Sequence, residues 1–510
     1  MRRALLVVAL VVLAGCAGLA PTATPDDPTD SPEPTAEADT DGINAPSTDG
    51  QEGGDADAPA TDSVVHEERP DPETDVLGWH DGYWYDDPVT INVTDGLNES
   101  ELDAVVARTG ARVEMLRDLP FEETVDVRLI NRSSLTGSGG EASDTTAARF
   151  EDEQFRALFL VGDTADASQR EAETTGQTVG GFYSPTTGEI LVVTDSGTPR
   201  VDVSVLAHEL THALQDQHFD LRGVMSTTTQ DRTHARLGLV EGDAEVVRTG
   251  YEERCGEVWA CVEYGPSGPG GNGSGQQPGS SVHLGLYMNS FFPYNDGVEF
   301  VEALRSGEDW TPVDEAYERP PDTSKEIIDP AQYGLFEPAP TDLPDRSTDA
   351  WEPLSPPGSP RAQVVGQASL SVMFAYTLYD DFNQESVVGP DQVLNREDGE
   401  SNGTNPLNYD LAPTRGWTGD RLLIYDHAKS DETAHVWRIT WESGEDAETF
   451  VTAYEELLAH WGGTERDGTW QIPPESPFTG AYDVQVDDRN VTITNAPTPA
   501  QLEEVNRAAR

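Results

Sequence analysis

Residues 201–219 read VDVSVLAHELTHALQDQHF, and this stretch decides how the chain is interpreted. Its apolar residues recur at steps of three and four positions, which predicts an α-helix with one buried face. They are Val203, Leu206, Leu210 and Leu214. Asp202 suits the N-cap, because its carboxylate can accept a hydrogen bond from the first turn. We therefore expect a partly buried helix that starts after Asp202.

Two histidines of this helix form a candidate metal site. His208 and His212 stand one turn apart, so their rings project from the same face and two nitrogens can lie roughly 3–4 Å apart around one Zn²⁺ ion. Glu209 follows the first ligand, where it can take a proton from zinc-bound water and pass it to a leaving amine. This HExxH pattern is typical of zinc peptidases. The alternative is a surface helix with two incidental histidines. His218 lies off the ligand face, and we expect it to be structural.

The third metal ligand is expected on a second helix, predicted over residues 231–254, which read DRTHARLGLVEGDAEVVRTGYEER. Glu241 and Glu245 share a face, so Glu241 can bind the metal while Glu245 hydrogen-bonds a ligand imidazole. Asp243 projects to a different side, and His234 lies near the Glu241 face. The alternative is a solvated helix whose acidic residues reflect a very acidic protein.

These motifs resemble the gluzincins, the thermolysin-like clan of zinc metallopeptidases. The resemblance rests on VLAHELTHALQ followed by a helix with ExxxE, covers roughly residues 175–250, and implies a zincin-like fold. In that clan a glutamate one helix later is the third ligand, and an acidic residue four positions further supports the first histidine. Those roles fall on Glu241 and Glu245. The clan usually has Asp at the second of these positions, so Glu245 departs from it.

A hairpin before the zinc helix extends the resemblance. The stretch VGGFYSPTTGEILVVT is similar to the clan's hairpin, with the turn at residues 184–188 between β-rich runs. In the clan the first strand is a sheet edge that pairs with the substrate backbone. The alternative is ordinary sheet structure. The resemblance thus implies a substrate-binding strand of Val179, Gly180, Gly181, Phe182 and Tyr183.

A narrower resemblance reaches further along the chain, to a family of exported HExxH surface lipoproteins, many of them haloarchaeal. The shared stretches are ALQDQHFDL at 213–221, PYxxGxxFVxxL at 293–304, PPDTSKEIIDPAQY at 320–333 and GWTGDR at 416–421. That family often has His at the position of Asp329, so a catalytic role of that His would put activity here in question. The gluzincin clan stabilises the oxyanion with His or Tyr from a later helix. Candidates here are His283, Tyr287 and Tyr333.

The net charge of −63, from 31 basic and 94 acidic residues, is the most unusual feature of the composition. Residues 76–510 carry −49 of it, so the excess is not confined to the N-terminal region. Molar salt shortens the Debye length to about 3 Å and screens such self-repulsion. Only two residues, Lys325 and Lys429, are lysines, against 29 arginines. Together these favour a salt-saturated habitat over a moderate one, and the charge argues against nucleic acid as a partner.

Residues 1–16, MRRALLVVALVVLAGC, predict export and a lipid anchor. Two arginines precede an apolar run too short to span a bilayer, which is typical of a signal peptide. Its end resembles a lipobox, in which cleavage precedes Cys16 and the thiol carries lipid; a chance cysteine is the alternative. Residues 17–75 hold 17 acidic residues and almost no aromatics, which predicts a disordered stalk. We expect a protein held by Cys16 on the outer face of the cell membrane.

Cys255 and Cys261 are the two remaining cysteines. Because an exported chain folds in an oxidising compartment, we expect them to close a small disulfide loop after the second helix. Two unpaired thiols are the alternative.

The fold class expected is α+β, in two parts. Residues 76–340 are predicted to form a zincin-like metal-binding domain with a small mixed sheet, and residues 341–510 a smaller α+β region. Helices are predicted over 361–380 and 445–461, strands over 416–425 and 434–441, and a closing strand pair over 482–494. Trp417 and Trp437 are expected in the core.

Two functions follow from these patterns. The first is a cell-surface zinc peptidase that hydrolyses peptide or protein substrates, with Glu209 activating a zinc-bound water. The alternative is a catalytically inactive surface binding or structural protein on a gluzincin-like fold. The intact HELTH sequence favours the enzyme, whereas Asp329 and the unassigned electrophile favour the alternative.

Overall fold

The computed structural model describes residue 72 and residues 76–92, 95–132, 145–194, 200–262 and 282–507, apart from single positions at 306, 308, 358, 384 and 398. The predicted signal peptide with Cys16, and nearly all of the predicted stalk, lie outside these residues. Among the helices that are described, none is long and apolar enough to cross a membrane.

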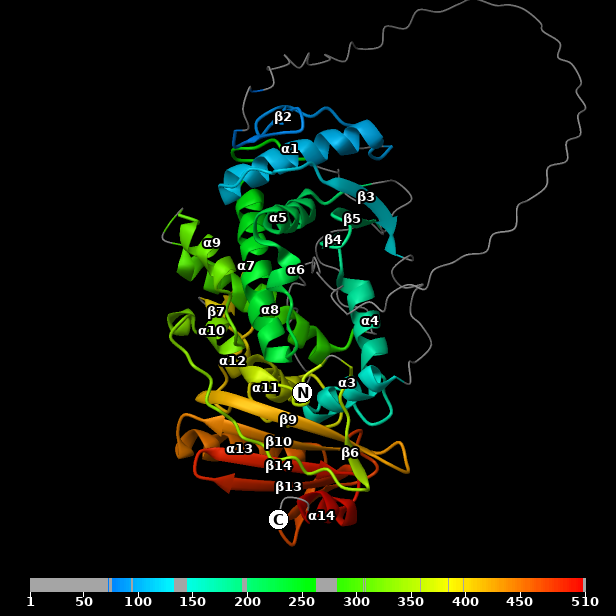
Figure 1. Cartoon of the computed structure of the whole chain (residues 1–510). Helices are drawn as coiled ribbons and strands as arrows, with labels where there is room; N and C mark the ends of the chain where they lie inside the picture. The colour runs from blue at the N-terminus through cyan, green and yellow to red at the C-terminus, as the bar shows by residue number, and fades with distance from the viewer. Residues whose placement is uncertain are drawn as a thin grey trace, which may run out of the picture. The chain divides into compact units, whose positions relative to one another are not determined.

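The fold is α+β, as predicted (Figure 1). The helices are α1 (Glu99–Arg117), α3 (Thr146–Ala157), α4 (Ala167–Thr178), α5 (Val203–Phe219), α6 (Leu221–Val224), α7 (Gln230–Arg254), α8 (Leu284–Leu304), α9 (Thr311–Glu318), α10 (Ser324–Ile328), α11 (Gly366–Ala375), α12 (Pro390–Val393), α13 (Gly444–His460) and α14 (Pro499–Arg507), with the 3₁₀ turns η1 (Pro330–Gln332) and η2 (Tyr376–Leu378). The strands are β1 (Trp79–His80), β2 (Tyr83–Trp84), β3 (Asp126–Asn131), β4 (Gly181–Ser184), β5 (Glu189–Thr194), β6 (Trp351–Pro353), β7 (Arg396–Glu397), β8 (Glu400–Ser401), β9 (Trp417–His427), β10 (Thr433–Trp441), β11 (Thr464–Arg466), β12 (Thr469–Ile472), β13 (Gly480–Asp487) and β14 (Asn490–Ala496).

A small mixed sheet precedes the HExxH helix. Its order is β3-β5-β4, with β3 parallel and β4 antiparallel to β5. The hairpin β4–β5 and the edge position of β4 agree with the sequence-based prediction. The predicted strand of residues 179–183 starts two positions before β4, and Gly180 already accepts a hydrogen bond from Val193 N of β5. Val179 caps α4, because its backbone N–H still donates to the Thr175 carbonyl, and the strand begins only at Gly181.

Three helices form the centre of the N-terminal part, and Figure 1 shows α5, α7 and α8 (green) next to one another. Helix α5 begins after Asp202, whose carboxylate accepts a hydrogen bond from Ser204 N. Helices α7 and α8 approach closely where two glycines meet. A Cβ on Gly242 would lie 2.2 Å from the Gly297 carbonyl oxygen, far inside van der Waals contact. The absence of side chains there lets the two backbones touch.

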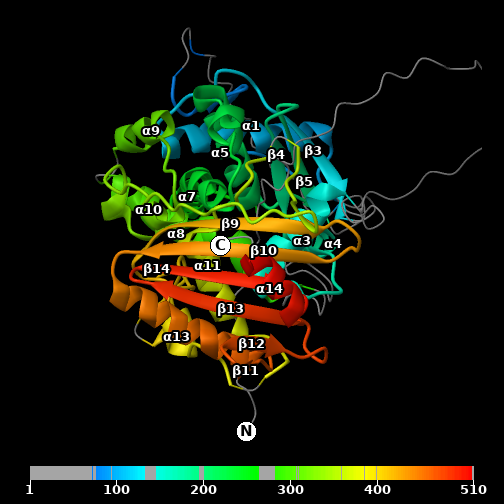
Figure 2. The ribbon, with the colours of Figure 1, turned by 60° about the horizontal axis from the view of Figure 1, so that its bottom comes forward.

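The C-terminal part contains a seven-stranded antiparallel sheet of order β11-β12-β13-β14-β10-β9-β6, and Figure 2 shows its strands β9 to β14. Successive side chains point to opposite faces, so the sheet supports two apolar layers. Leu422 and Trp437 face the main core with Phe450 of α13. Leu423 faces a smaller cluster that Leu502 of α14 covers.

One hydrophobic cluster contains residues from both predicted parts, including Leu210 and Val240 as well as Trp417 and Trp437. Both tryptophans are fully buried, as expected. The described residues also belong to one compact unit. The boundary near residue 340 therefore stays a prediction.

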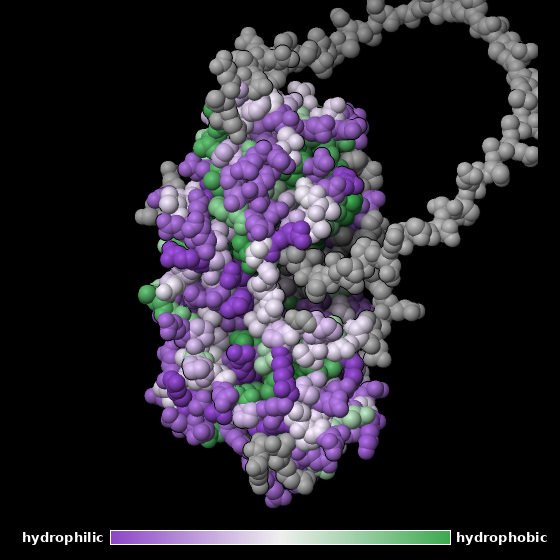
Figure 3. Space-filling view, in the orientation of Figure 1, coloured by the Kyte–Doolittle hydropathy of each residue, from purple (hydrophilic) through white to green (hydrophobic). Residues whose placement is uncertain are grey.

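The molecular face in Figure 3 is mainly hydrophilic, with apolar colour in scattered patches. Among the described residues, the large exposed apolar side chains are Met115, Val258, Leu335, Phe382 and Val486.

Candidate metal centre

Three side chains from α5 and α7 converge in the interior. His208 Nε2 and His212 Nε2 lie 3.0 Å apart, and Glu241 Oε2 lies 3.2 Å from each of them. The spacing agrees with that expected of two imidazoles sharing one ion. All three side chains are buried, and together they are the group of His, Cys, Asp and Glu residues in the described chain that could hold a metal.

Both imidazoles are oriented through their other nitrogen. His212 Nδ1 lies 2.9 Å from Gln215 Oε1, and Gln215 Nε2 in turn donates to the Val240 carbonyl at 3.0 Å. His208 Nδ1 lies 3.4 Å from Glu245 Oε2, a longer contact. With the Nδ1 proton directed to an acceptor, the Nε2 lone pair of each ring is available to a metal. Glu245 is also held by Arg248, whose Nε lies 2.7 Å from it.

The electrostatics of the centre keep its carboxylates charged. Burial raises the pKa of Glu241, but His212 and His208 outweigh this effect and lower it to about 2. Burial also opposes ionisation of Glu245, whereas Arg248 and His208 bring its pKa to about 2. An anionic Glu241 beside two ring nitrogens is a suitable donor set for a divalent cation. The second oxygen of Glu241 has no hydrogen-bond partner among the described residues, which also suits a metal ligand.

Glu209 lies beside this group and is fully buried. No side chain of the described residues hydrogen-bonds to its carboxylate, although the backbone N–H of Tyr183 in β4 lies near it. Burial raises its pKa, and the charges of His208 and His212, together with the Tyr183 N–H, only partly oppose the rise. Strand β4 passes close by, since a Cβ on Gly181 would lie 3.3 Å from Glu209 Cγ. A buried carboxylate with so few hydrogen bonds is costly unless it serves a ligand or water.

The other polar residues of these two helices have structural partners. Asp243 pairs with Arg117 at 2.8 Å and accepts a hydrogen bond from Tyr317. His218 lies 2.7 Å from the Pro120 carbonyl, as its expected structural role requires. His234 lies 2.7 Å from Gln230 Nε2, and burial lowers its pKa to about 4.

The three candidate electrophiles occupy other environments. His283 caps α8 and contacts the Tyr376 hydroxyl, and the Tyr333 hydroxyl donates to the Arg319 carbonyl. Tyr287 is buried and stacks on Phe291. Asp329 caps the turn η1 by accepting a hydrogen bond from Ala331 N.

Sequence reasoning missed two residues at the centre. Tyr294 of α8 stacks on His208, with ring centroids 6.1 Å apart and planes 20° from parallel. Gln215 orients His212. Both lie in stretches on which the expected resemblance to exported HExxH proteins rests, 293–304 and 213–221, and this was the sequence signal available for them. Neither stretch by itself showed which side chain reaches the histidines.

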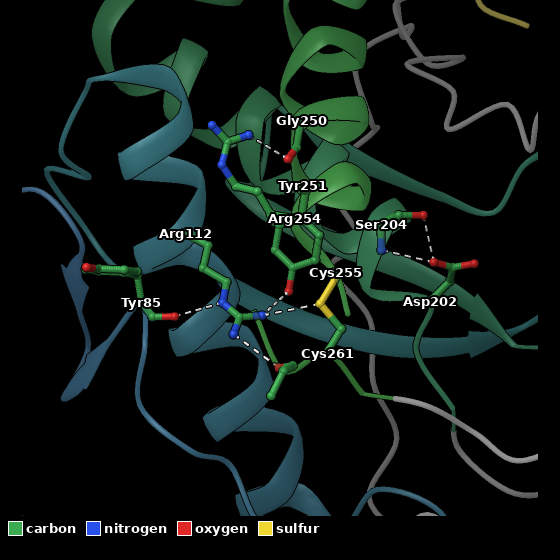
Figure 4. Close-up of a disulfide and its surroundings, with 10 residues drawn as sticks. Tyr85, Arg112, Asp202, Ser204, Gly250, Tyr251, Arg254, Cys255 and Cys261 are labelled. Atoms are coloured by element: carbon green, nitrogen blue, oxygen red, sulfur yellow. Dashed lines mark hydrogen bonds between the residues drawn. A yellow bond between two sulfur atoms is a disulfide. The ribbon is translucent and has the colours of Figure 1, made fainter. Parts of the chain in front are cut away.

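The predicted disulfide lies at the end of α7. Cys255 and Cys261 are bonded, and Figure 4 shows how a buried arginine supports their loop. Arg112 of α1 donates to the Ala260 carbonyl at 3.1 Å and to the Tyr251 hydroxyl at 3.0 Å. The loop thereby connects α1 to the C-terminal end of α7.

Comparison with known proteins gives one match. The model of a family described as a domain of unknown function, DUF8575, matches residues 352–506. No curated protein and no solved structure matches the chain. The matched range includes the seven-stranded sheet, whereas His208, His212 and Glu241 all precede it.

Proposed function

We propose that this protein is a zinc-dependent peptidase with a zincin-like, gluzincin-type metal domain. His208, His212 and Glu241 would hold the metal, and Glu209 would act as general base. The observation that carries the proposal is the convergence of three buried donor atoms within 3.2 Å of one another, beside a buried carboxylate that no side chain of the described residues hydrogen-bonds.

Zinc is the metal that this donor set suits best. Two imidazoles and one carboxylate are a common catalytic zinc set, and three protein ligands leave a further position open. When bound, zinc acts as a Lewis acid that polarises a carbonyl and lowers the pKa of water.

The chain's own residues supply proton transfer and positioning. Glu209 accepts a proton from the attacking water and returns it to the leaving amine, a task that its raised pKa favours. Gln215 and Glu245 fix the two imidazoles. The edge strand β4, which contacts Glu209 through Gly181, offers backbone groups to an extended peptide.

The setting of this activity follows from the N-terminal sequence and the charge. We infer a lipoprotein that acts on peptides or proteins at the outer face of the cell membrane, anchored at Cys16, in a salt-rich medium. Nucleic acid is not among the partners we infer, because a chain of net charge −63 repels phosphates.

The competing function is a surface binding or structural protein that keeps the metal without catalysis. The burial of all three ligands and of Glu209 favours this binding protein over the enzyme, because a substrate would have to reach the metal to be cleaved.

Two variants separate these functions. Glu209→Gln keeps the size of the side chain but removes the base, so zinc stoichiometry should stay near that of the wild type while peptide hydrolysis falls about 10²–10⁴-fold. His208→Ala removes a ligand and should lose both. Zinc content by mass spectrometry and turnover of a broad peptide set in concentrated salt are the measurements. If the wild type binds zinc and cleaves nothing, the binding protein replaces the enzyme.

A further inference from the structure

One cleft of the molecule is formed by residues other than those of the metal centre. It has a volume of about 1030 Å³ and is lined by the first turn of α7, by residues between 319 and 341, and by the start of β9. None of the metal-centre residues lines it. Its volume is at the upper end of the range for small-molecule sites, large enough for a short peptide.

Asp231 at the floor of this cleft has unused hydrogen-bonding capacity. The residue is 1% exposed. Its Oδ1 accepts from Ser324 N at 2.8 Å and from Ser324 Oγ at 2.6 Å, whereas Oδ2 has no hydrogen bond with any described residue. Burial and the negative charges of Asp420 and Glu326 raise the pKa of Asp231 to about 7, against hydrogen bonds from Ser324 that lower it. A cationic donor would relieve this uncompensated charge.

The other acids around Asp231 are already satisfied. Asp420 accepts from the backbone of Val365 and Gly366 and from the indoles of Trp417 and Trp437. The carboxylate of Glu326 caps α10 and accepts from Gly334 N.

One cationic side chain of the cleft, that of Arg421, also lacks an ion-pair partner among the described residues. Arg421 of β9 is exposed, and none of the described carboxylates forms an ion pair with it. Its partner across the strands is Arg438, so two like charges stand side by side in register. Adjacent like charges on a sheet are unfavourable unless an anion joins them. In a chain of net charge −63 this is an unusual place for two arginines.

We propose that this cleft binds a short peptide as a zwitterion, with its ammonium group on Asp231 and its terminal carboxylate on Arg421. The lining of the cleft also includes Pro320, Pro338 and Pro360, which suit the uncharged middle of such a ligand. The site is separate from the metal centre, and its occupancy does not depend on zinc.

The test uses triglycine and two blocked forms, N-acetyl-triglycine and triglycine amide, titrated into the full chain and followed by NMR at constant salt. Triglycine should bind most tightly, because each blocked form lacks one of the two charges. The same spectra report hydrolysis, so turnover at the metal centre is seen separately. The variant Glu209→Gln should bind triglycine as the wild type does, whether or not the chain is a peptidase.

Two cleft variants assign the two ends. Asp231→Asn should weaken triglycine and triglycine amide about tenfold, the loss of one charge-assisted contact. Arg421→Gln should weaken triglycine and N-acetyl-triglycine similarly and leave the amide form unchanged. Arg466→Gln, at an exposed strand arginine outside the cleft, is the control. Because Arg421 is exposed, replacing it should not prevent folding. The variant Arg421→Gln therefore tests the proposal even if Asp231→Asn does not fold. Equal binding by Arg421→Gln and wild type, or no binding of triglycine at tens of millimolar, would overturn the proposal.

Discussion

Gln215 links the metal centre to the neighbouring helix at the scale of a single residue. Its amide contacts both His212 Nδ1 and the carbonyl of Val240, the residue directly before Glu241. One side chain therefore fixes a ligand ring on α5 and the backbone beside a ligand on α7.

We expect Gln215→Leu to lower zinc affinity about 10–100-fold, the usual loss when a partner of a ligand histidine is removed. The variant keeps the bulk of the side chain but cannot accept the Nδ1 proton, so His212 is free to adopt the wrong tautomer. Competition with a zinc chelator measures the change. Gln217→Leu is the matched control, because Gln217 is on the same helix but bonds Glu122 and Glu123. Equal affinity in the two variants would remove Gln215 from the site.

The ligand residues were within reach of the sequence because local spacing determines them. A one-turn separation on a helix fixes which way His208 and His212 point, and the helix itself follows from apolar periodicity. Glu241 followed from the shared face of Glu241 and Glu245 on the second predicted helix, and the resemblance to the gluzincins implied the same role. Tyr294 could not be predicted, because its contact with His208 depends on how α8 packs against the rest.

At the scale of elements, the contact between α7 and α8 holds Glu241 in place. Gly242 directly follows Glu241, and its Cα faces the backbone of Gly297. This close approach leaves no room for a methyl group.

Gly242→Ala should therefore destabilise the protein by about 1–3 kcal/mol through overpacking, although alanine favours a helix more than glycine does. The added Cβ would meet backbone, which cannot rotate away. Gly250→Ala on the same helix is the control, since its Cβ would meet the Leu116 and Arg254 side chains at 3.3 and 3.4 Å, and these can move. Thermal melts of the two variants in the same salt test this. A midpoint for Gly242→Ala at or above that of Gly250→Ala contradicts the role of the contact.

Most elements that the sequence predicted lie within a few residues of their predicted positions. Strong periodicity explains this for α5 and α13, and alternation explains it for β9 and β10. The predicted strand began two residues before β4, because Val179 has an extended backbone like a strand residue but also caps α4. Which helices pack against each other was not predictable, since that depends on long-range contacts such as Gly242 with Gly297.

At the scale of the whole molecule, charge dominates. The net charge is −63, and ion pairs such as that between Arg117 and Asp243 cannot offset it, because the chain has only 31 basic residues for 94 acidic ones. Self-repulsion among the remaining carboxylates opposes the compact state.

We expect stability to fall as salt is diluted from molar concentrations to about 0.1 M, where the Debye length grows from about 3 Å to about 10 Å and neighbouring carboxylates are no longer screened. Unfolding midpoints across a KCl series measure the effect. Sucrose is the control, because an excluded neutral osmolyte favours burial without screening charge. If sucrose at low salt restores the midpoint as fully as KCl does, exclusion from the surface accounts for the dependence. If KCl alone restores the midpoint, charge screening accounts for the dependence. The acidic surface is then an adaptation in which the folded state needs salt to be stable.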